Sequence, residues 1–331
     1  MSKPTLRAIS AMQPTPFIEI VEERPILKEG FVLPIDKPKG PTSHDCVEWA
    51  RRALGIQAVG HSGTLDPMAS GLLILAVSKG TKLVPYLTEE NKVYQAVIAL
   101  GVETDTLDTE GTPIRSAPVP ILDLQTVREV ASRFVGRYFQ KVPLFSAIKV
   151  RGQALHRLAR QGKAEQIEPP AREVIAHAVE VIGLEAGRIA LRLDVGKGYY
   201  VRSLARDLAN ALGTVGHLAE LRRLQSGRIS VDAAIDGRLL EQAAQGKSES
   251  WQSLKSALVR AAIPLARAIQ FEKIQAPPSW IGRIANGQPL PIPQSIRCIQ
   301  GKRYAILHNE ELLGIGQCDG STLRLLRVLC H

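Results

Sequence analysis

The 331-residue sequence predicts an α+β fold followed by a small β-rich C-terminal region. Residues 188–195 alternate apolar and polar side chains, so one face of the predicted strand carries Ile189, Leu191, Leu193 and Val195. Residues 123–135 instead repeat apolar side chains at the spacing of an amphipathic helix. Short strand candidates recur after residue 277. This mixture of strand and helix patterns is typical of α+β proteins.

The composition is that of an ordinary soluble globular protein, with 45% hydrophobic and 22% charged residues. The length favours two domains. No signal peptide is evident, and the longest apolar run, 72–77, is far shorter than the roughly 20 residues that span a bilayer. The four cysteines are scattered, without metal-ligand spacing. We therefore expect a cytoplasmic protein with no bound metal, whose thiols are reduced and buried.

The N-terminal region predicts an extension and then a strand. Residues 1–29 contain several prolines and little periodicity, so we expect a loosely ordered extension with a short strand at 17–21. Residues 31–35 are apolar and predict a strand. Pro34 within them favours an edge or irregular position, because proline cannot donate to a strand ladder.

Local signals next predict one helix and two strands. Thr42 and Asp45 have the spacing of a capping box, and the helix that they begin is expected to end at Gly55. The apolar runs 72–77 and 93–100 predict strands. The acidic loop, residues 101–111, follows the second strand, and it lacks the spacing of an EF-hand calcium site.

The segment 61–71 is a glycine-bracketed loop that carries one acid, Asp66. Gly63 and Gly71 permit backbone conformations and close approaches that a Cβ forbids, and Pro67 disfavours a helical conformation at Asp66. Because an apolar run follows the loop directly, Asp66 is hard to interpret as a solvated surface charge. The alternative is a turn or cap residue that bonds local amides, and spacing alone favours that alternative.

A basic segment lies between residues 137 and 163. It contains no Asp or Glu, three interleaved aromatics (Tyr138, Phe139 and Phe145), and seven cations: Arg137, Lys141, Lys149, Arg151, Arg157, Arg160 and Lys163. The whole chain has a net charge of +10 and a pI near 9.6. Such a segment favours binding to a phosphate backbone and stacking on unpaired bases. The alternative is a solvated face, although such faces usually mix both signs.

The second half of the chain predicts further sheet strands, a helix and a linker. Residues 174–181 alternate as a strand, and 218–224 predict another. Apolar residues at helical spacing between 204 and 212 predict a helix that ends at Gly213. Residues 236–260 are rich in Ala, Gln and Ser, which indicates helix and linker.

Several motifs together resemble one protein family. The segment Gly60-His61-Ser62-Gly63-Thr64-Leu65-Asp66-Pro67 resembles the catalytic motif of the TruB family of tRNA pseudouridine synthases. Upstream, Asp36-Lys37-Pro38-Lys39-Gly40-Pro41-Thr42-Ser43 is similar to that family's other signature. The acidic loop, the basic segment and Lys197-Gly198-Tyr199-Tyr200-Val201-Arg202 match in the same order. The resemblance covers roughly residues 30 to 230, with a weaker match at the C-terminus.

The resemblance implies a fold and a domain organisation. We expect a mixed, mainly antiparallel central sheet with flanking helices in a catalytic domain at 30–235, which contains an RNA-gripping insertion at about 137–172. Residues 1–29 precede this domain, and a helical linker, 236–270, follows it. Residues 271–331 are expected to form a PUA-like RNA-binding domain.

The resemblance also implies an activity, the isomerisation of uridine to pseudouridine. This reaction needs no redox change, so neither a cofactor nor a metal is expected. By family analogy Asp66 is the nucleophile, and Arg202 pairs with it and keeps it ionised. Tyr200 is expected to pack against the target base and to accept the C5 proton, directly or through water.

The remaining site residues are expected to contact the RNA. Tyr94 matches the position that stacks on a flipped-out base, His61 the residue that takes the place of that base, and Leu221 an apolar contact to the base. Further substrate contacts are expected from Lys37, Lys149 and Arg151. Without the resemblance, a lone Tyr on a strand and a Leu before two arginines would be interpreted as packing residues.

The expected partner is the T-stem-loop of tRNA, with the target at the position conventionally numbered 55. A monomer that needs no protein partner and no membrane is expected. Two alternatives remain open. One is the guide-RNA-dependent branch that acts on ribosomal RNA, whose motif is nearly the same; the acidic loop and basic insertion favour the stand-alone branch. The other is an RNA-binding or tRNA-folding protein with secondary catalysis.

Overall fold

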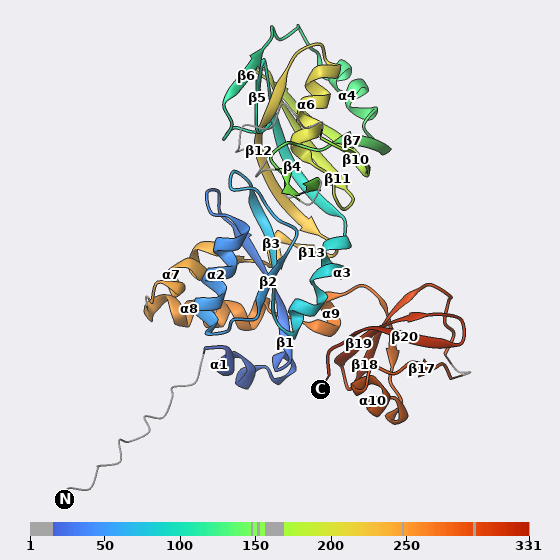
Figure 1. The fold of residues 1–331 in the computed structure, drawn as a ribbon. Helices are drawn as coiled ribbons and strands as arrows, with labels where there is room; N and C mark the ends of the chain where they lie inside the picture. The colour runs from blue at the N-terminus through green and yellow to red at the C-terminus, as the bar shows by residue number, and fades with distance from the viewer. Residues whose placement is uncertain are drawn as a thin grey trace, which may run out of the picture.

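The computed structural model describes residues 16–146, 148–150, 153–155, 169–246, 248–293 and 296–330. It contains a long mixed sheet with helices packed on it and a separate C-terminal module built on a second sheet (Figure 1). The predicted α+β fold with a small β-rich C-terminal region is confirmed. Within the described ranges, no helix is both long enough and apolar enough to cross a membrane.

The large sheet is mainly antiparallel. Its strands follow the order β14 (Ile235–Asp236), β1 (Gly30–Lys37), β3 (Ser70–Ser78), β12 (Gly216–Ser226), β4 (Lys92–Leu100), β11 (Arg188–Val195), β10 (Ala171–Glu185), β7 (Gly136–Lys141). Only the β1–β14 and β12–β3 pairs on this path are parallel. Three short strands pair at its sides: β2 (Val59–Ser62) with β3, β13 (Ile229–Ser230) with β12, and β15 (Ile263–Pro264) with β1. The strand β12 therefore lies at the centre, between two halves of the sheet.

The position of Pro34 agrees with its chemistry. On one side β1 pairs along its whole length with β3, from Gly30 to Lys37. On the other side it pairs with β15 only at residues 31–32 and with β14 only at 35–36. Pro34 lies in the gap between these two pairings, where no neighbouring strand requires its missing N–H. The predicted irregular position is confirmed.

Helices cover both ends of the sheet (Figure 1). At one end α2 (Ser43–Leu54) packs against α7 (Gly237–Ala244), which in turn contacts α8 (Ser248–Ala261). The predicted capping box is present: Thr42 and Asp45 bond each other's backbone N–H groups, and Gly55 ends α2 with φ +66°. At the other end lie α4 (Leu124–Ser132) and α6 (Val201–Ala211). The division into a catalytic domain and a helical linker stays a prediction.

The strand expected at 17–21 is wrong, because this segment is the helix α1 (Pro16–Glu23). Ile20 is fully buried in the main core, and Lys255 on α8 forms ion pairs with Glu19 at 3.3 Å and Glu23 at 2.7 Å. The short segment gave no clear periodicity by itself, and its helical face is defined by packing on α8.

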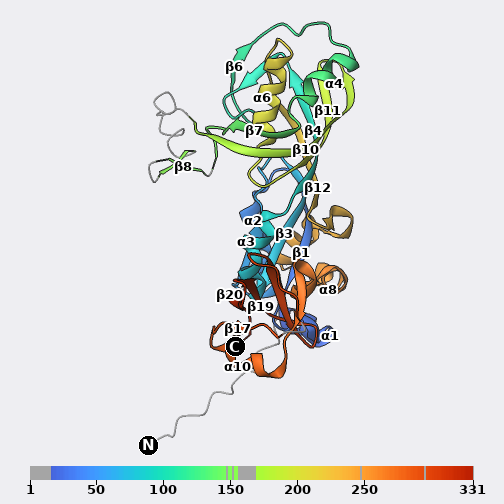
Figure 2. The same cartoon turned by 90° about the vertical axis from the view of Figure 1, so that its right-hand side faces the viewer.

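The C-terminal module is built on a five-stranded sheet. Its strands follow the order β16 (Glu272–Gln275), β18 (Arg303–His308), β19 (Glu311–Cys318), β20 (Thr322–Val328), β17 (Leu290–Pro291). Trp280 from α10 (Pro278–Ala285) and Tyr304 are buried in its core. Figure 2 shows this module at the opposite end of the molecule from β7 and β10. All four cysteines are free; Cys46 and Cys318 are buried, whereas Cys298 and Cys330 are partly exposed.

The expected RNA-gripping insertion is described only in part. A two-stranded ribbon pairs β8 (Lys149–Val150) with β9 (Gln153–Ala154). Residues 156–168 lie outside the described residues. Arg151 and the side chain of Lys149 lie outside them as well.

Candidate active site

The loop at residues 63–69, which joins β2 to β3, carries Asp66. Gly71 follows it with φ +100°, and a Cβ there would lie 2.3 Å from the carbonyl oxygen of Arg223. Only glycine therefore lets β3 approach β12 at this point. Ser43 Oγ donates to the carbonyl of Leu65 at 3.0 Å and accepts from its N–H at 2.8 Å. Both backbone groups of the residue before Asp66 are thus held by the start of α2.

Lys37 lies beneath this loop, and its side chain is fully buried. Its ammonium donates to the carbonyl oxygens of Pro41 at 2.7 Å, Pro38 at 2.9 Å and Pro67 at 3.5 Å. Burial lowers the pKa of Lys37, although Cys46 and Asp66 oppose this effect. Its three donors are used on backbone carbonyls, so Lys37 fixes the loop. The expected contact between Lys37 and the substrate stays a prediction.

Asp66 and Arg202 form an ion pair across 136 residues of sequence. Arg202 lies in the first turn of α6; its Nε is 2.9 Å from Oδ2 of Asp66 and its Nη2 is 3.4 Å from Oδ1. Arg202 also donates from Nη1 to the carbonyl of Thr106 at 3.0 Å and from Nη2 to that of Phe145 at 3.1 Å. The carboxylate of Asp108 is 3.7 Å from Nη1. The guanidinium is therefore fixed from several sides, and the predicted pairing is present.

The charge state of Asp66 depends on opposing effects. Burial raises its pKa above the ordinary value, Arg202 lowers it, and the nearby carboxylate of Asp108 raises it. The Arg202 side chain is only 7% exposed, whereas that of Asp66 is 36% exposed. Asp66 is therefore much more open to the space in front of it than Arg202 is.

That space is a cavity of about 490 Å³. Its walls come from the Asp66 loop, β4, the start of α6 and β12, and they include five residues predicted for the site: Asp66, Tyr94, Tyr200, Arg202 and Leu221. Phe145 and Ser146 from the basic segment also line it. Residues from distant parts of the sequence thus surround one carboxylate, with an aromatic ring on each of two walls.

His61 is placed beside this cavity rather than in its wall. It lies on β2 opposite Leu75 of β3 and is partly exposed. Burial, and then the charge of Arg223, lower its pKa, so its neutral form is favoured. The role expected for His61 stays a prediction.

The side chain of Gln140 binds the backbone of Tyr200. This side chain is 1% exposed; it accepts from the N–H of Tyr200 at 2.8 Å and donates to its carbonyl at 3.1 Å. Burial is the main cause that raises the pKa of Tyr200. The neighbouring Tyr199 accepts a hydrogen bond from the hydroxyl of Tyr138 at 2.8 Å. The hydroxyl of Tyr199 is therefore hydrogen-bonded to Tyr138, whereas the charge of Asp66 acts on the pKa of Tyr200.

The basic segment is less uniform than its sequence indicates. Tyr138 does not project as a free stacking ring, because its hydroxyl bonds Tyr199. Phe139 is 73% exposed. Arg137 lies 3.5 Å from Glu173, which β10 places across from this strand. This acid comes from outside the segment, so the local charge count overestimated the free positive charge.

Two buried cations in the cavity wall were not predicted. Arg223 is 1% exposed and donates to the carbonyls of Leu72 at 2.6 Å and Gly63 at 2.9 Å. Lys92 is 6% exposed and donates to the carbonyls of Thr88 and Glu90. Burial, reinforced by Arg223, lowers the pKa of Lys92 to about 8. The one available signal was the placement of Arg223 two residues after Leu221 on the same strand.

Comparisons with known proteins identify the family of the chain. The model of the TruB family pseudouridylate synthase N-terminal domain matches residues 51–201, and that of the tRNA pseudouridylate synthase B C-terminal domain matches residues 202–270. A protein named tRNA pseudouridine synthase B from Aromatoleum aromaticum is 39% identical over 88% of this chain and 89% of its own length. A protein of the same name from Geobacter sulfurreducens is 38% identical over 91% of this chain and 99% of its own length.

Solved structures agree on the fold. A Cbf5-Nop10-Gar1 complex contains a chain that is 25% identical, with a TM-score of 0.71, over 96% of this chain and 89% of that one. The structure of an H/ACA ribonucleoprotein bound to a substrate RNA containing 2′-deoxyuridine includes a chain that is 24% identical, with a TM-score of 0.68. The match covers 98% of this chain and 92% of that chain. The fold, and the family model that matches residues 51–201, define a pseudouridylate synthase. Within that class, the chain belongs to the TruB family.

Proposed function

We propose that this protein isomerises uridine to pseudouridine in the T-loop of tRNA, at the position conventionally numbered 55, with Asp66 as the nucleophile. The observation that carries the proposal is the Asp66–Arg202 ion pair, which opens on a cavity lined by Tyr94 and Tyr200. The curated relatives named above are called tRNA pseudouridine synthase B, which favours tRNA over ribosomal RNA as the substrate.

The reaction breaks the bond between N1 of uracil and C1′ of ribose, turns the base, and joins C1′ to C5. C5 then loses its proton and N1 gains one, so atoms and electrons balance without a co-reactant. A carboxylate can form a transient covalent bond that divides this rearrangement into easier steps. The proposed attack is at C6 of the base or at C1′ of the ribose. Arg202 keeps the carboxylate ionised before attack.

Tyr200 is proposed to pack against the detached uracil and to carry the C5 proton. Its pKa is raised by burial, so the phenol stays protonated at neutral pH. A protonated hydroxyl cannot act as a simple base, but it can accept one proton while it donates its own to water or to Asp66. Transfer through the hydroxyl therefore fits this environment better than direct capture by a phenolate.

The target base has to leave the folded loop before it reaches Asp66. Unstacking and unpairing a base cost a few kcal/mol, and stacking on an aromatic ring returns about 1–3 kcal/mol per base. We assign that stacking role to Tyr94, on the wall of the cavity, and an apolar contact to Leu221. His61, next to the cavity, is proposed to occupy the place that the base leaves.

The rest of the chain is proposed to hold the RNA. The insertion at about 137–172, with Lys149 and Arg151, grips the T-stem-loop, and the C-terminal module acts as a PUA-like RNA-binding domain. The enzyme is proposed to work in the cytoplasm as a monomer, without a protein partner or a guide RNA.

The test is to incubate purified protein alone with an unmodified tRNA transcript and to map pseudouridine by sequencing. We expect one modified site, in the T-loop. A product that forms only after a guide RNA is added would contradict the proposal, and so would modification confined to ribosomal RNA.

A further inference from the structure

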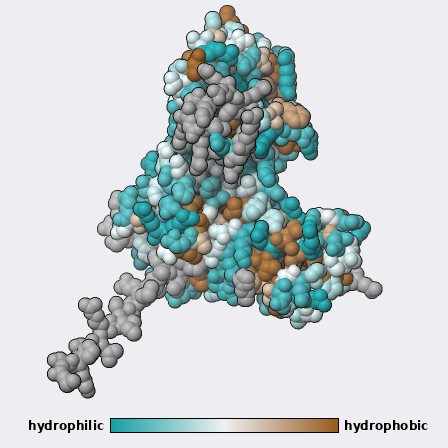
Figure 3. Space-filling model, in the orientation of Figure 1, coloured by the Kyte–Doolittle hydropathy of each residue, from teal (hydrophilic) through white to brown (hydrophobic). Residues whose placement is uncertain are grey.

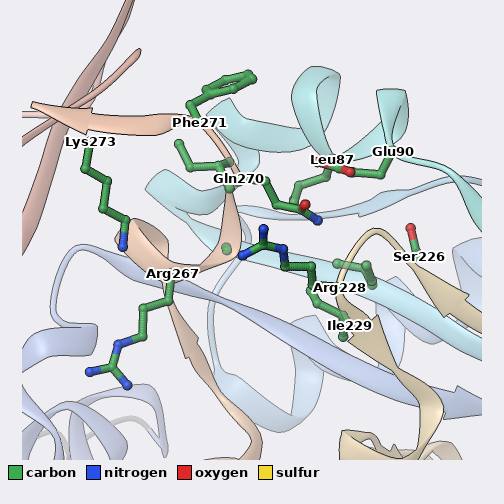
Figure 4. A pocket seen from close by; sticks show the side chains of 12 residues that line it. Leu87, Glu90, Ser226, Arg228, Ile229, Arg267, Gln270, Phe271 and Lys273 are labelled. Carbon is green, nitrogen blue, oxygen red and sulfur yellow. The ribbon is translucent and has the colours of Figure 1, made fainter. Parts of the chain in front are cut away.

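A second cavity, of about 340 Å³, lies where three parts of the chain meet (Figure 4). They are the end of α3 (Val84–Glu89), the end of β12 with the turn after it, and the segment 267–273 that leads into the C-terminal module; β3 adds Ile74 to the wall. We call it the junction cavity. Its apolar surface comes from Ile74, Leu87, Ile229, Ala268, Ile269 and Phe271.

Three cations are among the residues that line the junction cavity. Arg228 extends from the turn between β12 and β13, Arg267 from α9 (Leu265–Ala268), and Lys273 from β16. All three residues are exposed, and within the described part of the chain none of their side chains has a hydrogen bond or an ion pair. Their neighbours Lys302 and Arg303, by contrast, are each paired with a glutamate at 2.7 and 2.6 Å.

One carboxylate, Glu90, lies in the same wall. Burial raises its pKa, although the charges of Lys92 and Arg228 oppose this effect. Even with Glu90 ionised, its charge balances only one of the three cations, so the junction cavity keeps an excess of positive charge. An anion with more than one negative group is the ligand that best complements it.

The junction cavity shares its walls with the catalytic cavity. The segment from the end of α3 to the start of β4 contributes to both cavities. Leu87 and Glu90 line the junction cavity, whereas Thr88 and Lys92 line the catalytic cavity. The strand β12 contributes Leu221 and Arg223 to the catalytic cavity, and Ser226 and the following Arg228 to the other. The two cavities are therefore lined by neighbouring residues of the same chain segments.

Contacts between α3 and the C-terminal module hold these walls in place. Arg303 on β18 pairs with Glu89 at 2.6 Å, and its guanidinium carbon lies 5.7 Å from the ring centre of Tyr86. Phe271 meets Tyr86 edge-on, with ring centres 5.6 Å apart. Figure 3 shows hydrophobic residues gathered where the module meets the rest of the chain. The site is therefore preformed, which lowers the cost of binding.

From these observations we infer that the junction cavity binds backbone phosphates of the substrate RNA, outside the loop that enters the catalytic cavity. The inference rests on the proposed function, because it identifies the anion as the same RNA. Arginine and lysine side chains without partners, on a rigid concave surface, release counterions when phosphates replace them. The junction cavity would thus extend the contact from the modified loop towards the rest of the tRNA.

The test compares two RNAs and two matched variants. The triple variant Arg228→Gln, Arg267→Gln, Lys273→Gln removes the three cations, and the control Arg128→Gln, Arg133→Gln, Arg238→Gln removes the same charge from exposed positions that line neither cavity. Binding of full-length tRNA and of the isolated T-arm stem-loop is measured over a range of salt concentrations, after circular dichroism has shown that both variants are folded.

We expect the triple variant that lacks the three cavity cations to bind full-length tRNA at least about tenfold more weakly. The slope of its log K against log salt should be flatter by about 0.7–0.9 per lost contact. Its affinity for the stem-loop should stay close to that of the control. Equal losses in the two variants, or equal losses for the two RNAs, would overturn the inference. Pseudouridine formation by the wild-type protein is assayed in parallel. If the wild type makes none, the proposed function fails whatever the binding result.

Discussion

The Nε and Nη2 atoms of Arg202 face the two carboxylate oxygens of Asp66, at 2.9 and 3.4 Å. The same guanidinium donates to the carbonyls of Thr106 and Phe145, from the acidic loop and the basic segment. Arg202 therefore connects three segments, and it holds the proposed nucleophile in one orientation at the edge of the cavity. A fork of donors in fixed geometry is what arginine provides and lysine does not.

Replacing Arg202 with Met should slow single-turnover pseudouridine formation by about 10²-fold or more, because it removes a preorganised charge beside the reacting carboxylate. The remaining activity should also change its pH dependence. Arg202 is the largest influence that lowers the pKa of Asp66, so its loss raises that pKa. Activity needs the ionised form, and the acidic limb of the rate profile should therefore move to higher pH. Arg202→Lys should show a smaller shift. An unchanged profile in Arg202→Met would contradict the pairing.

Replacing Tyr94 separates stacking from hydrogen bonding. If the ring stacks on the flipped base, Tyr94→Phe should keep most of the binding and rate, whereas Tyr94→Ala should lose about 1–3 kcal/mol of binding. Fluorescence titration with tRNA and single-turnover assays give both quantities. Equal defects in the two variants would instead assign the role to the hydroxyl.

Replacing Lys37 with Met should destabilise the protein rather than weaken RNA contacts. Three carbonyl oxygens, those of Pro38, Pro41 and Pro67, would lose their common donor, at a cost of about 1–3 kcal/mol for a buried group left unpaired. Denaturant unfolding measures this loss, and tRNA affinity serves as the control. Normal stability combined with weakened tRNA binding would instead show that Lys37 contacts the substrate.

Local signals predicted much of the fold. The capping box at Thr42 and Asp45 and the helix end at Gly55 depend on a few neighbouring residues, and all of them are present. The buried face of β11 follows from simple alternation, and its four apolar residues are indeed buried. These features were predictable because their physical cause lies within a short stretch of chain.

Features that depend on distant partners were not predictable. The motif that contains Lys37 indicated its importance, but burial under the Asp66 loop follows from how β1 and β3 pair. Tyr138 lies in a basic, aromatic segment, yet its hydroxyl points to Tyr199, 61 residues later. The tie between Gln140 and Tyr200 arises in the same way. Composition can identify such residues, but only tertiary packing decides which way a side chain faces.

The basic segment offers a test of the RNA grip. If its cations meet phosphates, Lys149→Ala with Arg151→Ala should weaken tRNA binding and reduce the salt slope by about 0.7–0.9 per lost contact. Arg137→Ala should have a smaller effect, because Arg137 already lies 3.5 Å from Glu173. Wild-type affinity and slope in the double variant would mean that this segment is a solvated face and that the tRNA is held elsewhere.

The central claim is that Asp66 acts as the nucleophile, and Asp66→Asn tests it most directly. The amide keeps nearly the same shape as the carboxylate but lacks its charge and nucleophilicity, so the fold and the tRNA salt slope should be retained. The measurement is the single-turnover yield of pseudouridine at saturating tRNA. We predict no detectable product, alongside wild-type circular dichroism and tRNA affinity. Turnover within a few-fold of the wild type would contradict the account.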